Sequence, residues 1–253
     1  MELSFHLIVL LLGIVFVAGF VDSIAGGGGL LTLPAYLLFG LPPENALATN
    51  KFVNCAGSGI AVINFIKKKK YVKEFVIVGI IASLIGAYLG TKSVLLFDSA
   101  ITGKIITCML PVGMISILIP KKQNTEEVKI SRADIYIKTP LICFVFGFYD
   151  GFFGPGTGSF LAISFFTFLK IDLIRSTGNA KIFNFTSNLS SLIAFIIAGK
   201  VLYMIALPLM GASMLGNYIG SSTAIKKGHG FIKFFLTGVI ILLFVIFIGK
   251  YII

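Results

Sequence analysis

Apolar segments of about twenty residues follow one another along almost the entire chain of 253 residues. A helix of that length rises roughly 30 Å, which matches the hydrocarbon thickness of a bilayer. Only 12% of the residues are charged, whereas a soluble domain has about twice that fraction. Because backbone polar groups in lipid must be satisfied within the protein, the sequence predicts an all-α polytopic membrane protein.

Two of the apolar segments are too short to cross a bilayer. The segments are approximately 4–25, 29–40, 45–66, 74–97, 100–120, 135–153, 157–169, 172–198, 201–225 and 230–252. As helices, 29–40 and 157–169 would be only about 18–20 Å long. Each follows a glycine-rich break, Gly26 to Gly29 or Gly154 to Gly158. Glycine and proline end a helix there and let the backbone turn sharply.

The chain also contains an internal repeat. The run GFVDSIAGGG, which begins at Gly19, aligns with GFYDGFFGPG, which begins at Gly147, at an offset of 128 residues. After a two-residue insertion the offset becomes 130. At this offset, residues Lys51 to Asn54 align with Lys181 to Asn184, and Gly86 to Gly90 align with Gly216 to Gly220. We expect the paired glycines in the last alignment to serve helix packing. The alignment predicts two membrane repeats, residues 1–120 and 134–253, joined by a charged cytoplasmic linker at 121–133.

The distribution of basic residues favours an inverted arrangement of the repeats. Lys51 and Lys181 lie inside apolar segments, and an odd number of crossings per half divides the other basic residues 15 to 4 between the two sides. That division fits the positive-inside rule better than an even number of crossings does. It predicts inverted repeats with about four to five membrane helices each, and both termini outside the cytoplasm. Five crossings per half, or three with a re-entrant hairpin, both remain open.

Four ionisable residues lie deep within apolar segments, and the repeat pairs Asp22 with Asp150 and Lys51 with Lys181. A charge in hydrocarbon costs roughly 2.5–3.5 kcal/mol, so such residues usually face a polar cavity. We interpret the two aspartates as residues for ion coupling or for charge pairing with the lysines. The alternative is that each aspartate caps its broken helix or pairs with a lysine and only stabilises the fold.

Neutral hydrogen-bonding side chains surround both lysines. One positive charge with several neutral donors suits an oxyanion, and the N-termini of the short helices add N–H groups and a positive dipole end. Polar residues on these helices also suit contacts between helices, and glycines can simply permit tight packing. The candidate substrate-binding residues are Asn50, Lys51, Asn54, Asn179, Lys181, Asn184 and Asn188, with Gly28 and Thr157 at the starts of the short helices.

Other classes of function lack their sequence signatures. His6 and His229 have no metal-ligand spacing, and the chain shows no nucleophile elbow, P-loop or dinucleotide fingerprint. We therefore predict no catalytic residue, no metal and no cofactor. The net charge of +11 would suggest nucleic acid for a soluble protein. In a membrane protein, basic residues gather in cytoplasmic loops, and nucleic-acid binding is not expected.

These motifs resemble the sulfite exporter TauE/SafE family. The run from Gly19 to Pro34, followed by ATNK ending at Lys51, is similar to the family's first repeat. The run from Gly147 to Gly158, followed by GNAK ending at Lys181, is similar to its second.

The resemblance implies a multi-pass secondary transporter of the cytoplasmic (inner) membrane that is coupled to a proton or another cation. Its substrate would be a small sulfur-containing anion, such as sulfite, a sulfonate or thiosulfate, bound at the repeat interface. A passive anion channel and a membrane-embedded partner protein without a transport cycle are the alternatives. The particular anion, the direction of transport, the coupling ion and the oligomeric state, a homo-oligomer included, stay open.

Overall fold

The computed structural model describes residues 5–118 and 130–227, and over these ranges the secondary structure is helical. The long and short helices match the apolar segments to within a few residues. Segment 230–252 and most of the linker at 121–133 lie outside the described residues. The helices are α1 (Phe5–Ala25), α2 (Gly29–Leu38), α3 (Pro43–Lys67), η1 (Lys73–Phe75), α4 (Val76–Val94), α5 (Ser99–Leu118), η2 (Asp134–Lys138), α6 (Thr139–Phe152), α7 (Thr157–Phe168), α8 (Leu173–Ile197) and α9 (Tyr203–Lys227).

The outer surface of the helix bundle is apolar. Met204 is 91% exposed, Leu96 84% and Ile197 75%, which suits contact with lipid far better than contact with water. Four stretches of the described chain are long and apolar enough to cross a membrane: His6–Ile24, Lys73–Val94, Asp134–Phe152 and Leu173–Ile197. The fold is therefore that of an all-α polytopic membrane protein, as the sequence predicts.

Corresponding helices of the two sequence repeats have matching ends. Helices α3 and α8 each contain 25 residues, and both their first and their last residues are displaced by 130 positions. Each helix is followed by a residue in the left-handed region, Lys69 with φ 52° and Gly199 with φ 64°. Such a residue lets the backbone turn back on the last carbonyl groups of the helix. The repeat is thus one of backbone conformation as well as of sequence.

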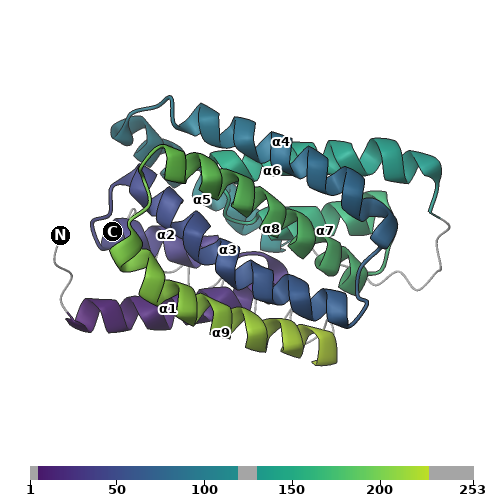
Figure 1. The fold of residues 1–253 in the computed structure, drawn as a ribbon, viewed down its shortest axis with the longest axis horizontal. Coiled ribbons are helices and arrows are strands. Elements are labelled where there is room, and N and C mark those ends of the chain that lie inside the picture. The colour runs from purple at the N-terminus through teal and green to yellow at the C-terminus, as the bar shows by residue number, and fades with distance from the viewer. Residues whose placement is uncertain (1–4, 119–129, 228–253) are drawn as a thin grey trace.

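The two halves of the chain interlock. Figure 1 shows α4 beside α6 at one edge of the bundle and α1 beside α9 at the other, with α3 and α8 between these pairs. Each outer pair combines one helix from the first half with one from the second. Residues from both halves therefore surround the centre of the bundle.

Glycines bring the outer helix pairs into close contact. A side chain at Gly86 of α4 would collide with the carbonyl oxygen of Phe144 in α6, and one at Gly216 of α9 with that of Phe16 in α1. These collisions correspond under the repeat alignment, since the glycines differ by 130 positions and the phenylalanines by 128. The prediction that these glycines serve helix packing is confirmed.

Candidate functional site

The two glycine-rich breaks lie against each other at the centre of the bundle. Gly26, with φ 77°, follows α1, whereas Gly154 and Gly156, with φ 102° and 87°, separate α6 from α7. Backbone in this region favours glycine, because a Cβ would be strained there. Gly26 and Gly158 approach so closely that a Cβ on either would collide with the backbone of the other. The two broken elements therefore meet.

Each buried lysine forms an ion pair with an aspartate of the other half. Lys51 Nζ lies 2.9 Å from Asp150 Oδ1, and Lys181 Nζ lies 2.8 Å from Asp22 Oδ2. All four residues are at most 6% exposed. A charge in such surroundings is tolerated only when it is paired and hydrogen-bonded. These four buried charges thus form two reciprocal pairs that connect the two halves.

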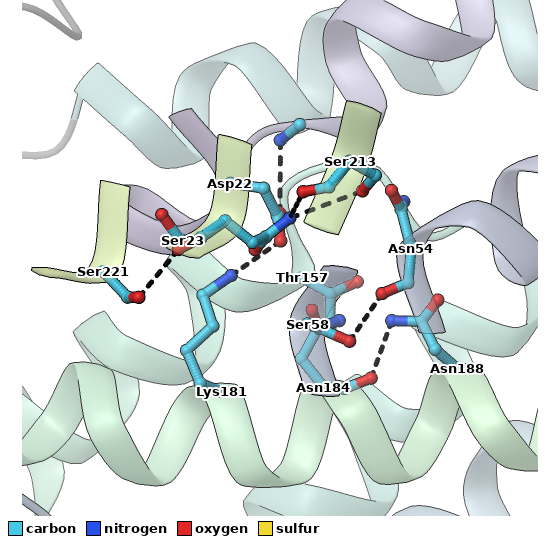
Figure 2. Close-up of polar contacts among 12 residues, drawn as sticks. Asp22, Ser23, Asn54, Ser58, Thr157, Lys181, Asn184, Asn188, Ser213 and Ser221 are labelled. Atoms are coloured by element: carbon cyan, nitrogen blue, oxygen red, sulfur yellow. Dashed lines mark hydrogen bonds and ion pairs between the residues drawn. The ribbon is translucent and has the colours of Figure 1, made fainter. Parts of the chain in front are cut away.

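The two carboxylates differ in their second partners. Asp150 Oδ2 accepts a hydrogen bond from Ser187 Oγ at 2.5 Å. Asp22 Oδ1 instead accepts one from the backbone N–H of Gly28 at 3.3 Å, while its Oδ2 forms the ion pair with Lys181 that Figure 2 shows. Asp22 is therefore anchored to the start of α2, whereas Asp150 is anchored to α8.

Asparagines of α3 and α8 lie close to the ion pairs. Asn50 Oδ1 accepts from Thr32 Oγ1 at 2.6 Å and from Asn54 Nδ2 at 3.2 Å. On α8, Asn188 Nδ2 donates to the backbone carbonyl of Asn184 at 2.7 Å (Figure 2). The helical spacing of four residues places both pairs on the face that is turned toward the breaks.

These groups surround a small polar pocket. It lies where the two breaks meet α3 and α8. Among the described residues that line it, Lys51 is the only lysine, and the two acidic residues are the aspartates of the ion pairs. The lining residues are Asp22, Gly26, Gly29, Asn50, Lys51, Asn54, Asp150, Gly154, Gly156, Asn184 and Asn188.

Four of the predicted binding residues do not line this pocket: Asn179, Lys181, Gly28 and Thr157. Asn179 is fully buried and donates to the carbonyl of Arg175, while its Oδ1 has no hydrogen-bond partner. Gly28 N–H donates to Asp22, and both the N–H and the hydroxyl of Thr157 donate to Gly154 O. The donors that we expected at the two short-helix N-termini are thus engaged within the protein.

Sequence reasoning missed Ser187 and the direct role of the break glycines in the lining. Ser187 aligns with Gly57 in the first repeat, so the repeat gave no signal for it. The sequence identifies the break glycines as turns. That they also line the pocket follows from the close approach of the two breaks. Among residues 5–118 and 130–227, no group of three or more His, Cys, Asp or Glu residues could hold a metal ion.

A helix bundle with an apolar surface and a buried, charged, polar pocket defines a polytopic membrane protein with an internal site. Residues 11–247 match the family described as "Sulfite exporter TauE/SafE". The chain belongs to this family, as the resemblance of its two repeats implies.

Curated relatives of the chain are described as probable membrane transporter proteins. A protein of Haemophilus influenzae is 35% identical over 234 residues, which cover 92% of this chain and 91% of the relative. YfcA of Escherichia coli K12 is 37% identical over 229 residues, or 88% and 84% of the two chains. YdhB of Bacillus subtilis is 25% identical over 221 residues, or 85% and 87%. No solved structure matches the chain significantly. The family and these relatives identify the protein as a membrane transporter.

Proposed function

We propose that this transporter moves a small sulfur-containing oxyanion, of the sulfite, sulfonate or thiosulfate class, across the cytoplasmic membrane by an ion-coupled cycle. The observation that carries the proposal is the pocket in which Lys51 and four asparagines face two touching helix breaks. Broken helices that meet at a buried polar site are the usual substrate site of secondary transporters. The family description names sulfite, which directs the proposal to sulfur oxyanions.

The chemistry of the lining fits such a substrate. Lys51 offers a compact ammonium with up to three donors, and each asparagine side chain offers an amide NH₂ group. A sulfite or sulfonate group has three oxygens, all of them acceptors. Asn54 and Asn188 each use one amide hydrogen within the protein, on Asn50 Oδ1 and on Asn184 O, and each amide has a second hydrogen to offer. We propose that Asn50, Lys51, Asn54, Asn184 and Asn188 bind the anion.

The arrangement of the halves is the second part of the proposal: they insert in opposite orientations. The basic residues outside the apolar segments divide 15 to 4 under this topology. The matched contacts of the α1–α9 and α4–α6 pairs support two equivalent bodies that rock about the site. Each reciprocal ion pair joins one half of the chain to the other at this site.

Uptake into proteoliposomes tests the transport proposal. Wild-type protein should accumulate radiolabelled sulfite or sulfoacetate with saturable kinetics, and Lys51→Ala should lose at least nine-tenths of that rate, about 1.4 kcal/mol or more of transition-state stabilisation. The matched control is Lys92→Ala, which removes an exposed lysine from α4. Undiminished uptake by Lys51→Ala would remove the lysine from the binding site.

The same assay separates the two alternatives. A passive anion channel would show flux without saturation and without any effect of an ion gradient. A membrane-embedded partner protein without a transport cycle would show neither flux nor ligand-dependent thermal stabilisation by any of the sulfur oxyanions. Ligand that binds only the folded state raises its apparent stability by mass action. The polar pocket between the two touching helix breaks supports the transporter over both alternatives.

A further inference from the structure

The two reciprocal ion pairs have unequal access to the pocket. Both members of the Lys51–Asp150 pair line it, whereas only the aspartate of the Lys181–Asp22 pair does. An anion in the pocket can therefore reach the ammonium of Lys51 but not that of Lys181. The near-symmetry of the repeats is broken at the point where a substrate would bind.

The second partners of the carboxylates are also unequal. If Asp150 leaves Lys51, its Oδ2 keeps the hydrogen bond from Ser187. The matching position for Asp22 is Gly57, where a Cβ would collide with Ser213 Oγ. Asp22 instead stays tied to Lys181 and to the N–H of Gly28. Each carboxylate thus has one donor besides its lysine, a side-chain hydroxyl for Asp150 and a backbone N–H for Asp22.

Charge balance then decides what must accompany the anion. The lining residues that the structure describes carry one positive charge, from Lys51, and two negative charges, from Asp22 and Asp150. An anion that takes the ammonium of Lys51 leaves the Asp150 carboxylate buried with only a hydroxyl donor. A buried carboxylate without a cationic partner binds a proton. The pocket then gains one negative and one positive charge, and its net charge is unchanged.

We propose that the anion displaces Asp150 from Lys51 and that Asp150 takes up one proton as it leaves, while the Lys181–Asp22 pair stays closed. The proton comes from the solution that delivers the anion, and it adds to the carboxylate without any other bond being made or broken. Ser187 is a positioning residue that holds the displaced carboxyl group. This inference rests on the proposed anion binding and identifies its coupling ion as the proton.

The other ionisable groups near Asp150 do not replace it in this role. Lys51 faces it from α3, and Cys55 lies one turn further along that helix. Tyr149 on α6 donates its hydroxyl to Pro155 O. Asp22 on α1 and Lys181 on α8 are paired with each other. Helix α4 packs against α6 beside Asp150, and it does so there through its backbone at Ala87 and Ser83.

The pH dependence of anion affinity tests the inference with purified protein. Methanesulfonate is a suitable probe, because it stays ionised and its own titration cannot contribute. Calorimetric titration of the wild type should give a dissociation constant that rises about tenfold per pH unit over the pH range in which binding takes up one proton. In Asp150→Asn the pocket needs no proton, and the constant should not change with pH.

The matched control changes the other pair. Lys181→Met/Asp22→Asn should bind more weakly yet keep the wild-type slope. Ser187→Ala should change the pH profile of anion affinity, because the hydroxyl that holds the displaced carboxyl group is lost. This variant tests the inference even if Asp150→Asn does not fold. A flat wild-type profile, an Asp150→Asn slope equal to that of the wild type, or a slope lost in the control double variant would each overturn it.

The outcomes distinguish the inference from the proposed function. If none of methanesulfonate, sulfite and sulfoacetate binds the wild type at any pH, the proposed anion site is wrong. The inference then fails with it. If one of them binds with no linked proton, the anion site stands and the inference alone is overturned. Sulfite and sulfoacetate serve only to establish binding, because their own titration obscures the slope.

Discussion

Lys181 Nζ lies 2.8 Å from Asp22 Oδ2, although 159 positions separate the two residues in the chain. The pair is reciprocated by Lys51 and Asp150 at 2.9 Å. Each half of the protein therefore neutralises the buried charge of the other. The centre of the bundle is a joint between the halves, and the polar pocket lies within that joint.

Removal of one partner from a buried pair should destabilise the protein far more than removal of both. Lys181→Met leaves Asp22 charged and unpaired, at a cost of about 3–5 kcal/mol. Lys181→Met/Asp22→Asn removes the charge as well and should recover most of that loss. Denaturant unfolding in detergent micelles measures the difference. Equal losses in the single and double variants would show that the two residues are not energetically coupled.

Close packing between α1 and α9 should make Gly216 intolerant of even a methyl group. Gly216→Ala places a Cβ against the Phe16 carbonyl oxygen, and overpacking of this kind costs about 1–3 kcal/mol. Gly211→Ala on the same helix is the control, because nothing lies within 4 Å of a Cβ there. It should be neutral or stabilising by up to about 1 kcal/mol. Similar thermal unfolding of the two variants would contradict the close contact.

The Glu44–Lys200 pair, at the end of the bundle, should give a pH-dependent share of stability. Lys200 Nζ, 2.6 Å from Glu44 Oε2, holds the pKa of Glu44 below its ordinary value of 4.5. When folding lowers the pKa of a carboxyl group, the group stabilises the folded protein at any pH above its ordinary pKa. This contribution is lost as the pH falls through the folded-state pKa. Glu44→Gln should therefore unfold at a lower temperature than wild type at neutral pH. The gap should close below about pH 4.5, and a gap that persists in acid would contradict the pairing.

Inverted insertion predicts opposite accessibility for two equivalent loops. Lys68 and Ala198 are both exposed, lie just beyond α3 and α8, and are 130 positions apart. In a background without native cysteines, Lys68→Cys should react with an impermeant maleimide only from the cytoplasmic side. Ala198→Cys should react only from the other side. Labelling of both from one side would show parallel repeats.

Much of this architecture could be predicted because its signals are local or repeated. Helix ends at the glycine-rich breaks follow from backbone sterics, and the segment lengths follow from hydropathy. The offset of 130 positions aligns Lys51 with Lys181 in the sequence. The first and last residues of α3 and α8 differ by the same 130 positions. The glycine pairs of α4 and α9 also act in packing as their spacing indicates.

The pairing of the charges could not be predicted, because it depends on how the halves dock. Sequence spacing offers no reason for Lys51 to choose Asp150 over Asp22. The departure from symmetry was equally hidden: Lys181 has the same local sequence signals as Lys51, yet only Lys51 lines the pocket. Ser187 has no counterpart in the first repeat, where Gly57 packs against Ser213. Tertiary contacts decide all three features.

The most direct test of the anion site is a structure of the wild-type protein determined with sulfoacetate. We expect density for the sulfonate group between the two breaks, with its oxygens within about 3.2 Å of Lys51 Nζ and of the amide of Asn54 or Asn188. The Lys181–Asp22 pair should remain closed in that structure. Two results would contradict the assignment of the anion site to Lys51 and its neighbours. One is an empty pocket at a sulfoacetate concentration that saturates transport, and the other is a sulfonate bound away from Lys51.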